Sequence, residues 1–187
     1  MDQQALIERA QRGDHDAFAE LIDPALARLD AAARLILRDR ELARDAVQEA
    51  LIRAWRDARG LRDPERFNAW LYRLTVNACL DIARRRRRRV MEVTIDSLEL
   101  PGQVDLARDL ARRETVDEAL RTLDPGHRAV VALHYLLDLP LHEVADVLGI
   151  PVGTVKSRLH YSIELMRSGV VRDADSPRSV APGGQVA

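Results

Sequence analysis

Six arginines follow one another over residues 84–89 and form the densest concentration of charge in the sequence. Adjacent guanidinium groups repel one another, so a phosphate backbone that neutralised them would release counterions and gain salt-sensitive affinity. The alternative is a solvated helix end, because cations are favoured near the C-terminus of a helix. We favour phosphate binding and expect contacts with nucleic acid from Arg84, Arg85, Arg86, Arg87 and Arg88.

A second group of hydrogen-bond donors lies in Leu141–Leu159, which has the form of a helix-turn-helix. Gly149 supplies the left-handed backbone of a tight turn, and Ile150 fills the angle between the two helices. In the second helix, Val155 and Leu159 are expected to point inward. The outward positions are then Thr154, Lys156, Ser157 and Arg158. These donors suit phosphates and base edges in the major groove, whereas the alternative is an ordinary helical hairpin with a polar outer face.

A third candidate surface precedes the arginines on the same predicted helix. Helical spacing places Trp70, Arg73 and Asn77 on one side, together with Asp81. An aromatic ring can stack on a base, an amide can bond a base edge, and a cation can hold the backbone, as in single-strand binding. A buried tryptophan beside a solvated or capping asparagine is the other interpretation, and these residues alone leave both open.

A fourth set has a different chemistry. Asp45, Gln48, Glu49 and Ile52 recur at the spacing of one helical face, beside an apolar stripe. An exposed isoleucine next to carboxylates and an amide suggests a surface for docking another protein. The alternative is a solvated face with one half-buried apolar residue.

The elements that carry these side chains are predicted to be helices. Helical periodicity covers most of residues 2–89 and predicts helices near 2–12, 16–37, 41–58 and 64–88, with a break or kink at Pro24. The pairs Asp23–Pro24 and Asp63–Pro64 each suit an N-cap followed by proline at the first helical position.

The helical pattern stops over residues 90–104, where Pro101–Gly102 indicates a linker. It resumes near 105–123 and 127–137, followed by two short helices around the turn at Gly149. Residues 173–187 are predicted to be a disordered tail. The sequence therefore predicts an all-α fold in which two small helical domains, 1–89 and 105–172, are joined by a flexible linker.

Composition agrees with this fold class. The 187 residues are 47% hydrophobic and 32% charged, which is enough for one compact domain or two small ones. Only 4% are aromatic, so an all-β fold is excluded.

The single cysteine, Cys79, excludes an internal disulfide and a multi-cysteine zinc site. No apolar run approaches the roughly 18 residues of a membrane span. We expect a cytoplasmic chain with no membrane insertion, no metal and no cofactor.

Taken together, the motifs resemble bacterial RNA polymerase sigma factors of the extracytoplasmic-function (ECF) type, over roughly residues 5–170. The resemblance rests on three segments in order: Asp45–Trp55, Phe67–Asn77 with the arginines that follow, and Gly149–Leu159. Members of this family have two helical domains, usually called sigma2 and sigma4. The resemblance implies that residues 1–89 are sigma2-like and residues 105–172 are sigma4-like.

The resemblance also implies a promoter-specificity subunit that binds core RNA polymerase and promoter DNA and has no enzymatic activity of its own. It implies that the face with Asp45, Gln48, Glu49 and Ile52 docks on the clamp helices of the polymerase. The surface from Trp70 to Asn77, with the arginines, would open the minus-ten element, with Asn77 beside a flipped-out base. Thr154–Arg158 would read the minus-thirty-five element, and an anti-sigma protein would cover the polymerase-docking faces.

An enzyme and a polymerase-independent DNA-binding regulator are the alternatives. The sequence has no Gly-rich phosphate loop and no Gly-x-Ser-x-Gly. Its five histidines lack metal-ligand spacing: His15, His127, His134, His142 and His160. A homodimeric regulator would use the same helix-turn-helix on a palindromic site. It would leave the Asp45–Trp55 motif without a role.

Overall fold

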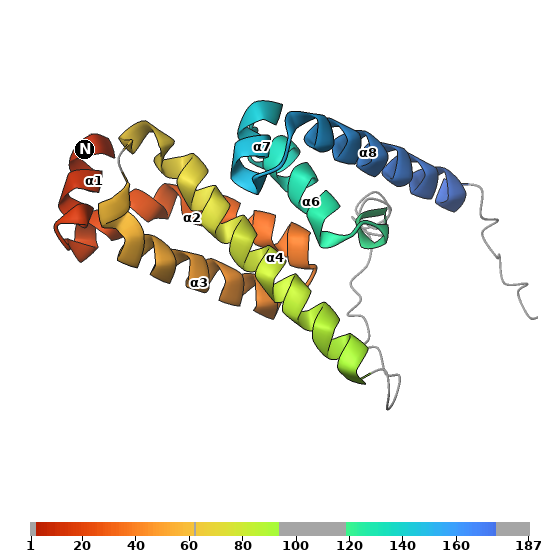
Figure 1. The fold of residues 1–187 in the computed structure, drawn as a ribbon, viewed down its shortest axis with the longest axis horizontal. Coiled ribbons are helices and arrows are strands. Elements are labelled where there is room, and N and C mark those ends of the chain that lie inside the picture. The colour runs from red at the N-terminus through yellow and green to blue at the C-terminus, as the bar shows by residue number, and fades with distance from the viewer. Residues whose placement is uncertain (1–2, 62, 94–118, 175–187) are drawn as a thin grey trace, which may run out of the picture.

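The computed structural model describes residues 3–61, 63–93 and 119–174, and the regular elements in these ranges are all helices (Figure 1). The α-helices are α1 (Gln3–Gln11), α2 (His15–Leu37), α3 (Arg40–Asp57), α4 (Phe67–Val93), α6 (Pro125–Val131), α7 (Leu141–Leu148) and α8 (Val152–Ala174). Shorter turns are the 3-10 segments η1 (Ala58–Gly60) and η2 (Pro64–Arg66) and the π-helical η3 (Ala132–Leu136). The predicted all-α fold class is confirmed.

The first unit of the fold comprises α1 to α4. Its core is formed by α2, α3 and α4, and α1 packs against α2. The side of α3 that faces α2 and α4 consists largely of buried alanines: Ala43, Ala46, Ala50 and Ala54. Small side chains let neighbouring helices approach closely, because the distance between helix axes depends on the residues at the contact. The buried part of the apolar stripe of α3 thus packs against α2 and α4. Its opposite face remains at the surface.

Aspartates cap the starts of α2, α3 and η2. The side chain of Asp14 accepts a hydrogen bond from the Ala17 N–H at 3.0 Å at the start of α2. Asp63 accepts one from the Glu65 N–H at 3.1 Å, with Pro64 at the first position of η2, so the predicted Asp63–Pro64 cap is confirmed.

The helix predicted over residues 16–37 is present as α2, but it has no break at Pro24 and the pair Asp23–Pro24 does not begin a helix. Helix α2 runs from His15 to Leu37 with Pro24 inside it. An internal proline removes one backbone hydrogen bond. Packing on both sides of Pro24 compensates, because residues of α2 before and after it are buried: Leu21, Ile22, Ala25 and Leu29.

The second unit contains the predicted helix-turn-helix. Helix α7 ends at Gly149, whose φ of 64° is left-handed, and α8 follows. Ile150 is half-buried in the angle between the helices, as predicted. However, α8 has 23 residues and is not short.

Two boundaries also differ from those predicted. Helix α4 continues to Val93 instead of ending near 88, and α8 continues to Ala174, two residues into the predicted tail. The remaining parts of the predicted linker, the helix near 105–123 and the tail fall mostly on residues 94–118 and 175–187, which lie outside the described ranges.

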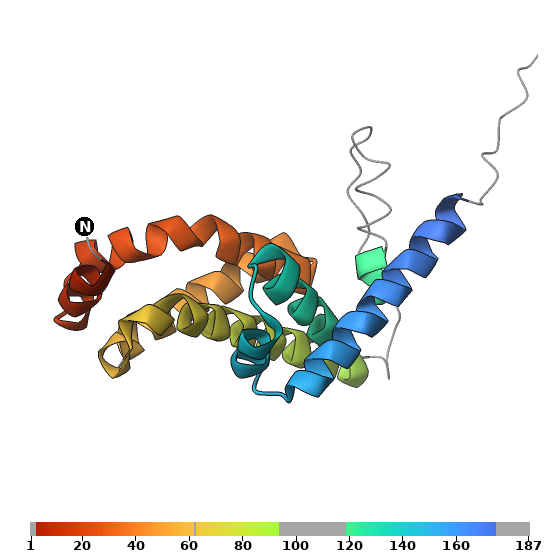
Figure 2. The same ribbon diagram turned by 90° about the horizontal axis from the view of Figure 1, so that it is seen from above.

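The two units pack against each other. Helix α6 and η3 contact α2, whereas α7 contacts α4 (Figures 1 and 2). Arg28 of α2 donates to the Leu136 carbonyl at 3.3 Å and to the Asp138 carboxylate at 3.1 Å. Helix α8 extends away from the first unit at its C-terminal end (Figure 2). None of the helices in the described ranges has the length and apolarity needed to cross a membrane.

Candidate protein and nucleic-acid interfaces

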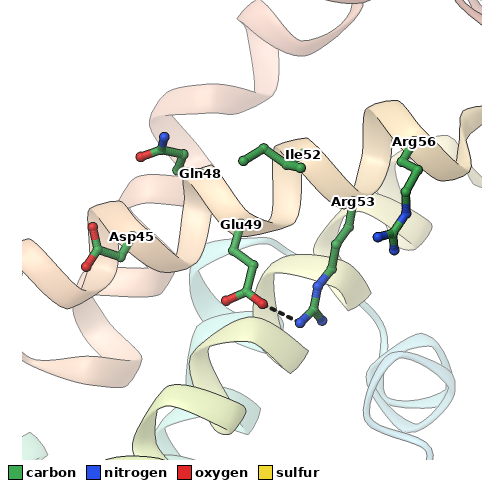
Figure 3. A pocket seen from close by; sticks show the side chains of 6 residues that line it. All are labelled: Asp45, Gln48, Glu49, Ile52, Arg53 and Arg56. Atoms are coloured by element: carbon green, nitrogen blue, oxygen red, sulfur yellow. Dashed lines mark hydrogen bonds and ion pairs between the residues drawn. The ribbon is translucent and has the colours of Figure 1, made fainter.

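The four predicted docking residues of α3 lie together on its outer face (Figure 3). Asp45, Gln48 and Ile52 are exposed, and Glu49 is half-buried. Ile52 is 58% exposed, which is unusual for a large apolar side chain on an ordered helix. The four residues line a shallow depression, and Arg53 and Arg56 complete its border. An apolar centre with a polar rim is the composition of a protein-contact surface.

Glu49 connects this face to the arginine block, residues 84–89. One of its carboxylate oxygens pairs with Arg53 of the same helix (Figure 3). The other lies 3.5 Å from a terminal nitrogen of Arg85 on α4. The predicted docking face and the predicted nucleic-acid face are therefore in contact through one carboxylate.

The arginine block divides into two halves. Arg84 pairs with Asp81 at 2.9 Å, and Arg86 pairs with Asp39 at 3.4 Å. All six arginines are exposed, but within the described ranges the second half, Arg87, Arg88 and Arg89, has no ion pair. Asp39 was not among the residues predicted to contribute to these surfaces. Only the Asp81–Arg84 pair had a signal in the sequence, its i, i+3 spacing.

The surface with Trp70, Arg73 and Asn77 has features of both interpretations, a partly buried tryptophan and exposed groups that could contact nucleic acid. Trp70 is half-buried and packs on Phe67, with ring centroids 5.9 Å apart. Arg73 is exposed, and Asn77 is half-buried two turns after Trp70. A cavity of about 320 Å³ is shared by Trp70 and Arg73 of α4 with Asp146 and Val147 of α7. Nucleic acid that used Trp70 and Arg73 would compete with α7 for this surface.

The donors of α8 have the predicted orientation. Val155 and Leu159 are buried, Lys156 and Ser157 are exposed, and Thr154 and Arg158 are half-buried. The Ser157 hydroxyl donates a hydrogen bond to the Thr154 carbonyl at 3.0 Å, so in this arrangement its proton is not available to a ligand. Lys156 is thus the most accessible cation of this set.

A groove between α2 and α3 was not expected from the sequence. It encloses about 1120 Å³ and is bordered by Gln48 and Ile52, so it adjoins the docking face. Trp55, near the C-terminal end of α3, is half-buried and lines this groove. Its ring stacks on His15 with centroids 4.0 Å apart and meets Phe18 edge-on at 5.1 Å.

Cys79 has no features of a reactive thiol. It is buried, and burial raises its pKa to about 12. The thiolate is the reactive form, so this thiol is inert at neutral pH. In the described ranges, no three histidine, cysteine or carboxylate side chains are grouped so that they could hold a metal ion.

Comparison with known proteins identifies the class. Residues 21–89 match the family Sigma-70 region 2, and residues 113–163 match Sigma-70, region 4. The chain is 30% identical over 173 residues to the ECF RNA polymerase sigma factor SigW of Bacillus subtilis, covering 86% of this chain and 92% of SigW. It is 35% identical over 169 residues to the ECF sigma factor SigL of Mycobacterium tuberculosis, covering 87% and 94%.

A solved structure shows the same arrangement of helices. The structure of CnrH in complex with the cytosolic domain of CnrY superposes with a TM-score of 0.66 at 30% identity, covering 94% of this chain and all of the other. The fold and the helix-turn-helix are thus those of a two-domain transcription initiation factor. The chain belongs to the ECF family of RNA polymerase sigma factors.

Proposed function

We propose that this sigma factor docks on the clamp helices of core RNA polymerase through the α3 face with Asp45, Gln48, Glu49 and Ile52. The observation that supports this role most strongly is the exposure of Ile52 amid polar side chains. Burying an exposed isoleucine at an interface contributes about 1.5–3 kcal/mol. The exposed carboxylate of Asp45 adds preference for a basic group of the partner at that position.

We propose that α4 contacts the minus-ten element. Trp70 would stack on a base, Asn77 would bond a flipped-out base, and Arg73 with Arg84–Arg88 would hold the backbone. The half-buried positions of Trp70 and Asn77 support this role, because they let each side chain be oriented by its neighbours while retaining an open edge.

We propose that α8 reads the minus-thirty-five element through Thr154, Lys156, Ser157 and Arg158. The buried Val155 and Leu159 support this, because they fix the rotation of the helix and direct the donors outward. Lys156 is suited to a phosphate or a guanine edge.

These roles imply two arrangements of the chain. With α7 against Trp70 and Arg73, the minus-ten surface is partly covered. Binding of a promoter would therefore require α7 to separate from α4. We propose that the packed arrangement belongs to the free protein and that the domains part on polymerase.

We further propose that an anti-sigma protein regulates the chain by covering its polymerase-docking faces. CnrH, which is 30% identical to this chain, was solved in complex with the cytosolic domain of a second protein, CnrY, and this supports binding of a protein partner by the same fold. On this account the chain catalyses no reaction, and it acts in the bacterial cytoplasm, where polymerase and chromosome are located.

The docking role is tested by Ile52→Glu. A carboxylate at the centre of the face would have to be desolvated, so we expect affinity for core polymerase to fall at least about tenfold. Ala19→Glu, at an exposed position of α2 outside the assigned surfaces, is the matched control. Fluorescence anisotropy of labelled protein titrated with core polymerase gives both affinities. Equal affinities for the two variants would contradict the assignment.

A further inference from the structure

Three carboxylates face the first half of the arginine block. Arg84 pairs with Asp81 of its own helix at 2.9 Å. Arg85 reaches Glu49 of α3 at 3.5 Å, and Arg86 reaches Asp39, the N-cap residue of α3, at 3.4 Å. Guanidinium groups make the same charge-assisted hydrogen bonds to carboxylates as to phosphates. The carboxylates therefore occupy cations that a nucleic-acid backbone would also bind.

The two carboxylates from α3 are held by further contacts. Asp39 uses Oδ1 to accept the backbone N–H groups of Glu41 and Leu42, each at 3.1 Å, and leaves Oδ2 for Arg86. Glu49 shares its two oxygens between Arg53 and Arg85. Each carboxylate is thus anchored independently of the block. It does not depend on the arginine to stay in place.

We propose that Asp39, Glu49 and Asp81 are internal counter-ions of the arginine block that compete with nucleic-acid phosphate and lower the affinity of the free chain for DNA. The inference rests on the proposed nucleic-acid role of the block. In each pair the carboxylate is half-buried but the arginine is exposed, so the pairs are individually weak and phosphates can exchange with them. Non-specific binding is suppressed, whereas a promoter held by additional contacts can still displace the carboxylates.

Glu49 also belongs to the proposed docking face, so binding of polymerase should change the competition between carboxylates and phosphate. A basic side chain of polymerase that engaged Glu49 would draw it away from Arg85. Arg85 would then be available to phosphate. By linkage, DNA on Arg85 would strengthen the engagement of Glu49 by the same factor.

The test is DNA binding by the full chain without polymerase. Fluorescence anisotropy would follow a labelled single-stranded oligonucleotide of non-promoter sequence over a series of KCl concentrations. We expect Glu49→Gln to raise affinity about two- to fivefold at low salt, the range for the loss of one exposed pair. We expect a similar gain for Asp39→Asn, in which an asparagine keeps the N-cap.

The matched control is Glu41→Gln, which removes an exposed carboxylate from the same helix. Within the described ranges, Glu41 has no ion pair with the arginine block. Replacing Arg84, Arg85 and Arg86 together by glutamine should abolish the gain in the Glu49→Gln background. Circular dichroism of each variant confirms that the helices are retained.

Two results would overturn the inference, and they differ. If the arginine substitutions weaken binding but Glu49→Gln and Asp39→Asn gain no more than Glu41→Gln, the carboxylates are not competitors and the DNA role of the block stands. If the arginine substitutions leave affinity unchanged in every background, the nucleic-acid role of Arg84, Arg85 and Arg86 fails, and the competition fails with it.

Discussion

Asn77 and Lys156 are proposed to contact DNA in two different ways. Asn77 is half-buried on α4, whereas Lys156 is exposed on α8. Removing the partner of a half-buried amide costs much binding free energy, because the unpaired polar group keeps its desolvation cost. An exposed cation contributes mainly a screened attraction. Substitutions at the two positions should therefore differ in what they change.

Asn77→Ala should weaken promoter opening while leaving polymerase binding intact. The loss of one oriented hydrogen bond to a flipped base is worth about 1–3 kcal/mol, which is a fall of about fivefold or more in the open complex. Permanganate reactivity of unpaired thymines measures opening, and anisotropy measures polymerase affinity. An equal loss of both would show that Asn77 has a structural role.

Lys156→Ala should reduce binding to the minus-thirty-five element. If Lys156 contacts a phosphate, the slope of log affinity against log salt should also fall by about one unit. Binding of a promoter duplex by the holoenzyme at several salt concentrations measures both quantities. An unchanged affinity and an unchanged footprint over the upstream element would assign base reading to another helix.

At the scale of elements, capping shows how far local sequence determines structure. The dipeptide Asp-Pro occurs at 23–24, 63–64 and 124–125 with the same local signal, yet only the last two begin helical segments. The difference lies in packing, since buried residues of α2 flank Pro24 on both sides. The outward faces of α3 and α8 followed from their own periodicity. By contrast, the contacts of Arg85 and Arg86 depend on how closely α3 and α4 approach, which no local pattern reports.

Asp124 gives a prediction at this scale. It caps α6 by accepting the N–H groups of Gly126 at 2.7 Å and His127 at 3.0 Å, and it meets Nδ1 of His127 at 2.6 Å. Burial raises the pKa of Asp124, but the hydrogen bonds from His127 outweigh it and leave the pKa below its usual value. Asp124→Ala should lower the free energy of unfolding by about 1 kcal/mol at pH 7, measured by urea denaturation.

The pH dependence follows from the direction of that pKa. A lowered folded-state pKa stabilises the protein fully above the usual carboxyl pKa, and this contribution is lost as pH falls through the folded value. The difference between wild type and Asp124→Ala should therefore shrink below about pH 4. Asp124→Asn is the control, because it keeps a capping oxygen but does not titrate there. A difference that stayed constant with pH would contradict this account.

At the scale of the whole molecule, the junction between the two units contains a poorly satisfied charge. Arg128 of α6 is only 9% exposed, and one terminal nitrogen donates to the Leu120 carbonyl at 3.5 Å. Within the described ranges its Nε has no hydrogen-bond partner. Burial and then the neighbouring charge of Arg38 lower the pKa of Arg128. A buried cation that lacks full compensation weakens the packed arrangement.

Arg128→Met should strengthen the packing of the two units. Replacing an incompletely paired buried charge by an apolar side chain of similar length should raise the free energy of unfolding by about 1–2 kcal/mol. Polymerase binding should weaken, because the domains must part. Urea denaturation and anisotropy measure the two effects, with Arg12→Met, at an exposed position, as the control. A less stable Arg128→Met variant would mean that Arg128 holds the junction together.

The central claim is that this chain selects promoters for RNA polymerase. The most direct test is transcription by purified core polymerase on fragmented genomic DNA of the source bacterium, with and without the chain. We expect discrete new transcripts whose start sites share minus-ten and minus-thirty-five elements. Absence of both new transcripts and co-elution with core polymerase, from a folded sample free of inhibitor, would contradict the account and favour a polymerase-independent DNA-binding regulator.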